Sequence, residues 1–163
     1  MNIQEQFNEI YQDHALKVYR LCLGYAAGDE EQAKEWQQET FVKVWKHRKS
    51  FNGSSSVSTW IFRIAVNVCL SDLRKSKKKE HRVDDLAAAE EYVHEDGENT
   101  SQIEKMYQCI NQLSENNKFL ILMELEEIPQ ATIAETMGVK HGAIRTRLSR
   151  VRKALLKCIK NEK

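Results

Sequence analysis

Hydrophobic residues recur every three or four positions through the first third of the chain. One such stripe covers residues 7–25 and ends near a pair of glycines. A second begins after Asp29, which is a favoured helix N-cap residue and is followed three positions later by Gln32. This second stripe ends in a cationic turn at residues 46–49, which suits the negative end of a helix dipole. The pattern predicts two helices joined by a short turn.

The next apolar segment, residues 57–73, fits two patterns at once. Some of its apolar residues alternate as they do in a strand, while others step as they do in a helix, namely Val57, Ile61, Ile64 and Val68. A run of this length without a turn signal is too long for an ordinary strand. We therefore expect a helix that continues into the basic tail at residues 72–82.

The second half of the chain predicts further helices at residues 103–113 and 119–125. Residues 129–145 then read as a short helix, a turn containing Gly138 and a second helix, which is typical of a helix-turn-helix. The inward stripe of the last helix comprises Ile144, Leu148, Val151 and Leu155. The positions it leaves facing outward include Arg145, Ser149, Arg152 and Lys153. Such a basic helix can read the major groove of DNA, or it can simply be a solvated amphipathic helix.

Composition supports an all-α fold. The 163 residues include one Pro and six Gly, too few for the many tight turns of a β-sandwich or barrel. No apolar run approaches the roughly 20 residues of a membrane span, and the first residues do not resemble a leader, so we expect a cytoplasmic protein without membrane insertion. The four cysteines are widely spaced and predict neither a zinc site nor a disulfide framework; we expect buried free thiols.

Charge divides the chain into three parts. A basic stretch at residues 71–82 is followed by residues 83–104, which carry eight acidic groups and no Lys or Arg. Residues 128–163 are again basic, with nine Lys or Arg against two acids. This distribution predicts two small helical domains, 1–82 and 103–163, joined by an acidic flexible linker at 83–102.

The aromatic residues near the first basic stretch suggest a second nucleic-acid surface. Phe51, Trp60 and Phe62 lie near Asn67 and a polar loop, and such a set can stack unpaired bases and read their edges. The alternative is that Trp36, Trp45 and Trp60 are core residues. Sequence alone leaves both interpretations open.

Several longer motifs resemble those of a known family. They are EWQQETFVKVW at residues 35–45, FNG at 51–53, TWIFRIAVN at 59–67, DLRK at 72–75, IAETMG at 133–138 and GAIRTRLSRVR at 142–152. In this order and spacing they are similar to regions 2 and 4 of the extracytoplasmic-function (ECF) sigma factors of the sigma-70 family. The resemblance implies a bacterial transcription initiation factor that directs core RNA polymerase to promoters.

The resemblance also implies roles for individual residues. Docking on the coiled coil of the polymerase β′ subunit would fall to Glu35, Gln38, Glu39, Phe41 and Trp45. Binding of the melted minus-10 element would fall to Phe51, Asn52, Trp60, Arg63, Asn67, Arg74 and Lys75, with Lys77, Lys78 and Lys79 adding phosphate contacts. Reading of the minus-35 duplex would fall to Lys140, His141, Arg145, Thr146, Arg147, Ser149 and Arg150.

The implied partners are the β′ coiled coil and β flap of core polymerase, promoter DNA and an anti-sigma factor. The acidic linker would lie in the path of nascent RNA, or it would be a solubilising spacer. A stand-alone helix-turn-helix regulator is the main alternative, and it would bind a promoter duplex without polymerase. An enzyme is disfavoured because no catalytic constellation, phosphate loop, metal spacing or cofactor motif accompanies the adjacent carboxylates.

Overall fold

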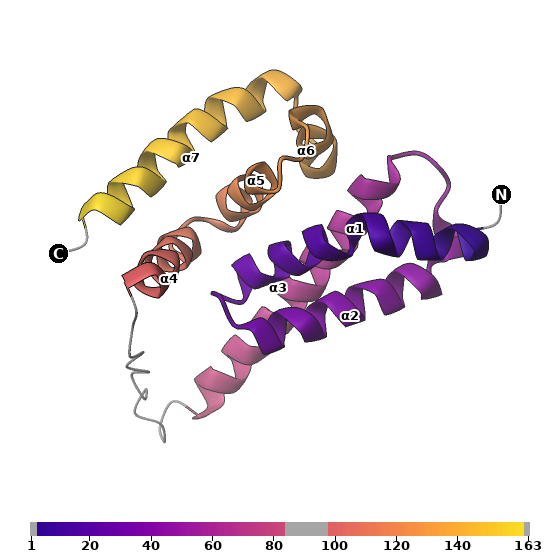
Figure 1. Cartoon of the computed structure of the whole chain (residues 1–163), viewed down its shortest axis with the longest axis horizontal. Coiled ribbons are helices and arrows are strands. Elements are labelled where there is room, and N and C mark those ends of the chain that lie inside the picture. The colour runs from indigo at the N-terminus through magenta and orange to yellow at the C-terminus, as the bar shows by residue number, and fades with distance from the viewer. Residues whose placement is uncertain (1–2, 84–97, 162–163) are drawn as a thin grey trace.

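The computed structural model describes residues 3–83 and 98–161 and confirms the all-α fold class. Seven α-helices and one 3-10 turn make up the described parts of the chain (Figure 1). They are α1 (Ile3–Tyr25), α2 (Glu30–Lys46), η1 (Arg48–Ser50), α3 (Val57–Val83), α4 (Glu98–Asn111), α5 (Glu115–Leu125), α6 (Gln130–Met137) and α7 (His141–Asn161). Helix α4 begins five residues before position 103, so residues 98–102 of the predicted linker are helical.

Helices α1, α2 and α3 form the first unit, a three-helix bundle. The predicted cap of α2 is present, since the Asp29 carboxylate accepts a hydrogen bond from the backbone N–H of Gln32 at 3.2 Å. The ambiguous segment is a helix, as its length indicated, and α3 continues to Val83. The buried indole of Trp36 donates a hydrogen bond from Nε1 to Asp72 at 2.8 Å, which joins α2 to the middle of α3.

Helices α4 to α7 form the second unit. The Ser114 hydroxyl caps α5 by accepting a hydrogen bond from the N–H of Asn117. Gly138 ends α6 in the left-handed conformation at φ 71°, which a residue without Cβ adopts at little cost. Helix α7 then lies along the outer edge, with α5 and α6 between it and the first unit (Figure 1).

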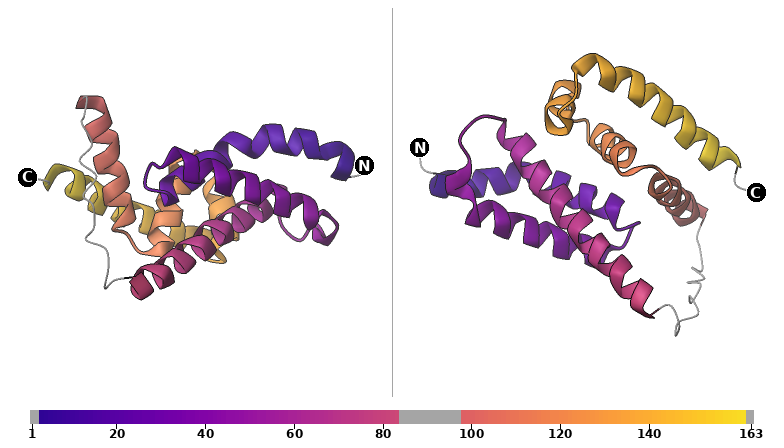
Figure 2. Two further views of the ribbon diagram at one scale, coloured as in Figure 1. Left: turned by 90° about the horizontal axis from the view of Figure 1, so that it is seen from below. Right: turned by 180° about the vertical axis from the view of Figure 1, so that it is seen from behind.

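The two units pack against each other. Buried residues of both belong to one continuous hydrophobic cluster, and α3 starts beside α6, as the views from below and behind show (Figure 2). Helices α1 and α5 approach so closely that a Cβ atom added at Gly24 would lie 2.2 Å from Leu122 Cδ2. Nearby, the Arg20 guanidinium donates to the Glu126 carboxylate at 3.2 Å.

The cysteine prediction was half wrong. Cys22 and Cys69 are buried free thiols, as expected, but Cys109 and Cys158 form a disulfide between α4 and α7. The two residues are 49 positions apart in the chain, and no motif in the sequence marks them as a pair. Their Cα atoms lie 5.9 Å apart only because the two helices pack side by side.

Candidate functional site

A groove runs between the outer faces of α1 and α2. Its volume is about 620 Å³, and its walls carry apolar, aromatic and amide side chains, namely Phe7, Tyr11, Lys34, Gln37, Gln38, Phe41, Val42, Trp45 and Lys46. Tyr11 and Val42 are large hydrophobic residues that remain 44% and 45% exposed. The Phe41 ring lies beneath them, edge-on to Tyr11 at a centroid distance of 4.8 Å. This is an open apolar surface that no described residue covers.

Three of the five predicted polymerase-docking residues line the groove, and the other two lie outside it. Gln38, Phe41 and Trp45 line the groove. Glu35 and Glu39 do not line it; both are exposed on α2, where Glu35 accepts a hydrogen bond from Gln32 and Glu39 pairs with Lys43 at 3.6 Å.

Sequence reasoning missed Tyr11 and Val42 as surface residues. Tyr11 belongs to the apolar stripe of α1 and reads as a core position. In the folded chain it lies at the edge of that stripe, where α2 leaves it partly uncovered. The sequence signal that could have identified this surface is an apolar residue next to, rather than within, the inward stripe of α2, which is the position of Val42.

The loop before α3 carries the aromatic pair predicted to bind unpaired bases. The rings of Phe51 and Trp60 lie 5.2 Å apart at a 40° tilt, and both are half-buried. Asn52 is exposed, and its side-chain oxygen accepts a hydrogen bond from the N–H of Ser54 at 3.0 Å. Of the three tryptophans, only Trp36 is a buried core residue; Trp45 and Trp60 keep part of their rings at the surface.

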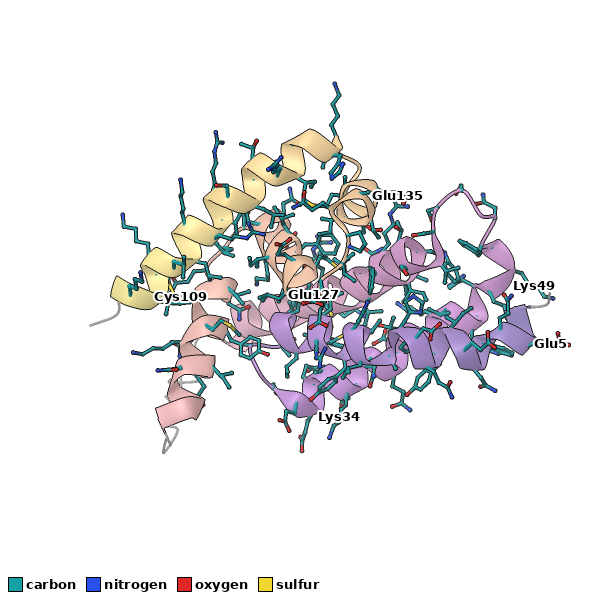
Figure 3. All side chains as sticks on the ribbon, turned by 45° about the horizontal axis from the view of Figure 1, so that its top comes forward. Glu5, Lys34, Lys49, Cys109, Glu127 and Glu135 are labelled. Atoms are coloured by element: carbon teal, nitrogen blue, oxygen red, sulfur yellow. A yellow bond between two sulfur atoms is a disulfide. The ribbon has the colours of Figure 1, made fainter. Side chains whose placement is uncertain are left out.

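The predicted minus-10 residues on α3 face the second unit. Arg63 donates from Nη2 to the carbonyl of Glu135 at 2.7 Å and from Nε to that of Thr136 at 3.4 Å, so its cation lies at the C-terminal end of α6. One turn earlier, the buried Thr59 hydroxyl donates to the Glu135 carboxylate at 3.4 Å. Glu135 projects from α6 toward the start of α3 in Figure 3. We call these four residues the α3–α6 contact.

Other members of this set are also close to the second unit. Arg63 and Asn67 line a cavity of about 380 Å³, whose opposite wall includes Phe119 and Met137 of the second unit. Farther along α3, Arg74 lies 3.8 Å from the Glu115 carboxylate, and Lys75 is exposed. The side chains of Lys77, Lys78 and Lys79, and residues 84–97 of the acidic linker, lie outside the described residues.

The predicted minus-35 residues are all exposed on or just before α7, namely Lys140, His141, Arg145, Thr146, Arg147, Ser149 and Arg150. Four of them line two separate hollows. His141 and Arg145 line a hollow with Gln130 of α6, whereas Arg147 and Arg150 line another beside Ser114 at the start of α5. The inward stripe has the predicted phase, with Ile144, Leu148 and Val151 buried.

Arg152 is exposed, as the stripe predicts, and its guanidinium pairs with the Glu124 carboxylate of α5. Positions 152 and 145 are two helical turns apart, so they share a flank of the stripe that borders α5 and α6. Among the described residues, no cluster of His, Cys, Asp and Glu is placed to bind a metal ion. No described helix has the length and apolar character that crossing a bilayer requires.

Each of the two units matches a known protein-family model. Residues 10–79 match the model described as Sigma-70 region 2, and residues 103–155 match the model described as Sigma-70, region 4. The ECF RNA polymerase sigma-E factor of Haemophilus influenzae is 30% identical over 93% of this chain and 86% of its own length. The ECF RNA polymerase sigma factor SigW of Bacillus subtilis is 26% identical over 97% of this chain and 91% of its own length.

Two solved structures share the fold. The sigma factor RpoE of Bartonella quintana, solved in complex with the anti-sigma factor NepR, aligns with a TM-score of 0.74 at 21% identity, covering 98% of this chain and 99% of that one. CnrH, solved in complex with the cytosolic domain of CnrY, aligns with a TM-score of 0.71 at 17% identity, covering 98% of this chain and 91% of that one.

Region 2 and region 4 models in tandem, together with relatives across nearly the full length, define the class of protein. The chain belongs to the sigma-70 family and is an ECF sigma factor, a bacterial transcription initiation factor.

Proposed function

We propose that the groove between α1 and α2 is the surface by which this sigma factor binds core RNA polymerase, through the coiled coil of the β′ subunit. The observation that carries the proposal is an uncovered apolar groove that contains three of the five implied docking residues. A helical partner with apolar side chains at helical spacing would bury Tyr11 and Val42, while Gln38 would hydrogen-bond at the rim. Glu35 and Glu39 would attract basic residues beside that helix.

Promoter recognition would fall to the predicted minus-35 and minus-10 residues. The exposed start of α7, with His141 and Arg145, would enter the major groove of the minus-35 element. Arg147 and Arg150 would contact the adjacent phosphates, and the β flap of polymerase would hold the second unit in place. Phe51, Trp60, Arg63 and Asn67 would bind the melted minus-10 strand, which requires the α3–α6 contact to open because Arg63 is engaged there.

An anti-sigma factor is the third proposed partner, and the cytoplasm, where polymerase acts, is the proposed location. The likeness that supports this partner extends over 98% of the chain and is to the sigma factor RpoE, which was solved in complex with the anti-sigma factor NepR. An anti-sigma factor that binds this arrangement would keep Arg63 in its contact with α6.

A charge in the groove tests the docking proposal. Val42→Asp should weaken association with core polymerase at least about tenfold, because a carboxylate would be desolvated in an apolar contact. Leu16→Asp is the matched control, since Leu16 is 56% exposed on α1 and does not line the groove. The measurements are co-elution with core polymerase and run-off transcription. Equal behaviour of the two variants, both folded by circular dichroism, would overturn the docking assignment.

Promoter-duplex binding with and without polymerase distinguishes a sigma factor from a stand-alone regulator. Specific binding of the promoter duplex by the free protein, as tight as binding by the polymerase complex, would favour the regulator. Binding that requires polymerase supports the proposed function.

A further inference from the structure

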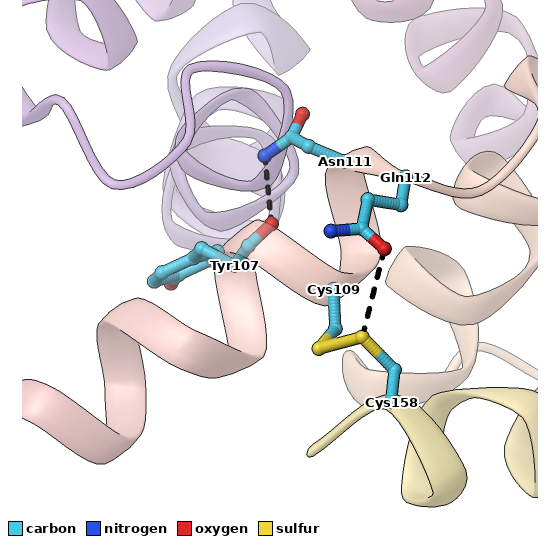
Figure 4. Close-up of a disulfide and its surroundings, with 5 residues drawn as sticks. All are labelled: Tyr107, Cys109, Asn111, Gln112 and Cys158. Atoms are coloured by element: carbon cyan, nitrogen blue, oxygen red, sulfur yellow. Dashed lines mark hydrogen bonds between the residues drawn. A yellow bond between two sulfur atoms is a disulfide. The ribbon is translucent and has the colours of Figure 1, made fainter. Parts of the chain in front are cut away.

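The disulfide between α4 and α7 lies outside the groove and the hollows assigned above to polymerase and to the minus-35 element. Cys109 lies on the last turns of α4, and Cys158 lies near the end of α7, beside Gln112 (Figure 4). Both helices belong to the second unit, so the bond does not join the two units. In the compartment where transcription occurs, thiols are kept reduced, and disulfides found there usually form and break in response to oxidants. The inference rests on the proposed function in one respect, which is the location of the protein in the cytoplasm.

The two cysteines differ in access. Cys109 is 1% exposed, whereas Cys158 is only partly buried. The side-chain oxygen of Gln112 lies 3.8 Å from Cys158 Sγ, where it can accept a hydrogen bond from the thiol once the bond is reduced. A small solute can therefore reach Cys158 but not Cys109.

The second cysteine pair provides a contrast. Cys22 and Cys69 also place two sulfur atoms close together, with a thiol–thiol hydrogen bond of 3.7 Å between α1 and α3. Both residues have no exposed surface. The hydrogen bond with Cys22, together with burial, raises the pKa of the Cys69 thiol far above its usual range. Because the thiolate is the reactive form and neither sulfur can be reached from solvent, we expect this pair to stay reduced.

The bridge has a mechanical consequence because the end of α7 has few other anchors. Val151 is the last residue of the inward stripe that is buried, and from 152 to 160 every described side chain is exposed or partly exposed. On α4, only Cys109 and Ile110 are buried among the described side chains. The crosslink therefore adds a covalent tie between two helix ends that bury few side chains of their own.

We propose that Cys109 and Cys158 form an oxidant-responsive thiol pair that clamps the end of the DNA-reading helix to α4, with Cys158 reacting first and Cys109 resolving. With a peroxide, the Cys158 thiolate attacks one oxygen, the O–O bond breaks, and Cys158 becomes a sulfenic acid as water leaves. The Cys109 thiol then attacks that sulfur, and the hydroxyl leaves as a second water. The two thiols lose two electrons and two protons, and the peroxide is reduced to two molecules of water. A dithiol reverses the reaction by attack on Cys158.

The clamp should change stability more than promoter preference. The base-reading start of α7 is held by Ile144 and Leu148, both fully buried and far along the helix from Cys158. Closing a loop of this length should raise the melting temperature of the full chain by about 5–15 °C relative to the reduced form.

Mass spectrometry tests the site. The reduced full-length protein is treated with hydrogen peroxide, quenched by alkylation and digested. We expect a Cys109–Cys158 linked peptide, with Cys22 and Cys69 alkylated only after unfolding. A Cys22–Cys69 link, or four free thiols after the peroxide has been consumed, would overturn the proposal.

Two single variants test the order of reaction. In Cys109→Ser the sulfenic acid at Cys158 has no resolving thiol, so dimedone should label Cys158. In Cys158→Ser dimedone should leave Cys109 unlabelled. Equal labelling of the two variants would contradict the assigned order.

Thermal unfolding in oxidised and reduced states tests the clamp, with the double variant Cys109→Ser/Cys158→Ser as the control. The wild-type melting temperature should fall on reduction, and that of the double variant should not change. A bond that survives excess dithiothreitol in the folded protein, or a melting temperature that does not respond to its reduction, would overturn the oxidant-responsive clamp without affecting polymerase docking.

Discussion

Two faces of the first unit differ in what covers them. The outer face of α2 is open, and its groove leaves Tyr11 and Val42 partly exposed. The face of α3 that carries Arg63 and Asn67 is turned toward α5 and α6 of the second unit. Both faces carry residues that the family resemblance assigns to binding. In this arrangement the polymerase surface is therefore open, whereas Arg63 of the minus-10 set, although exposed, is hydrogen-bonded to the end of α6.

The difference has a chemical basis. The groove is apolar with an amide and ammonium rim, so another protein can bury it. The α3 face offers a guanidinium and a hydroxyl, and the end of α6 satisfies both with carbonyl groups and a carboxylate. A melted DNA strand would compete for the same donors with its phosphates and base edges. The C-terminal end of α6, with the Glu135 carboxylate, thus occupies the donors of α3 that the proposed function assigns to DNA.

The largest expected effect comes from forcing the two units apart. Gly24→Leu should prevent the close approach of α1 to α5 and destabilise the closed arrangement by about 1–3 kcal/mol, because the added side chain overlaps Leu122. Small-angle X-ray scattering should show a larger radius of gyration. Gly142→Leu is the control, since a Cβ there meets no atom within 4 Å. An unchanged radius in Gly24→Leu would mean that this approach does not hold the units together.

An effect of similar size is expected at the aromatic pair. Trp60→Ala should weaken binding of a pre-melted minus-10 strand by about 1–3 kcal/mol if its half-exposed ring stacks on a base. Trp60→Phe keeps an aromatic face and should recover most of the affinity. The measurement is fluorescence anisotropy of a labelled strand with the polymerase complex, alongside a melting curve. A large loss of stability with unchanged strand affinity would make Trp60 a packing residue only.

Substitutions on the two sides of the α3–α6 contact should change the affinity for the melted strand in opposite directions. Arg63→Ala removes a proposed DNA ligand and should lower the affinity for the melted strand several-fold. Glu135→Ala removes only the acceptor of the Thr59 hydroxyl, so it should raise that affinity about two- to fivefold, as expected for the loss of one hydrogen bond of about 0.5–1 kcal/mol. If both variants weaken binding, the contact does not compete with DNA.

The smallest effect is expected at Glu39, which lies on α2 beside the groove. Glu39→Arg should leave the melting temperature nearly unchanged, because the exposed pair with Lys43 contributes only about 0–1 kcal/mol. It should slow association with core polymerase a few-fold, and more at low salt, since a rim charge acts mainly on the encounter rate. Stopped-flow association at two salt concentrations measures this effect. A rate that is independent of salt in both proteins would remove Glu39 from the docking surface.

Local sequence determined the helices and their ends. Asp29 and Ser114 cap α2 and α5 through bonds to N–H groups three residues away, and Gly138 ends α6 because it tolerates a positive φ. The inward stripe of α7 also follows from spacing alone. Each of these features depends on interactions within one or two helical turns, so a short window of sequence contains all of the partners.

Tertiary packing alone decided which surfaces are open, which are covered and which cysteines pair. Arg63 meets its acceptor 72 residues away, and Cys109 meets Cys158 after 49 residues. Tyr11 reads as a core residue, yet α2 leaves it at the surface. Such pairings follow from how amphipathic helices pack on one another, and many packings bury the same stripes. The energy differences among those packings come from side-chain fit and from polar contacts between distant segments, which helical spacing does not encode.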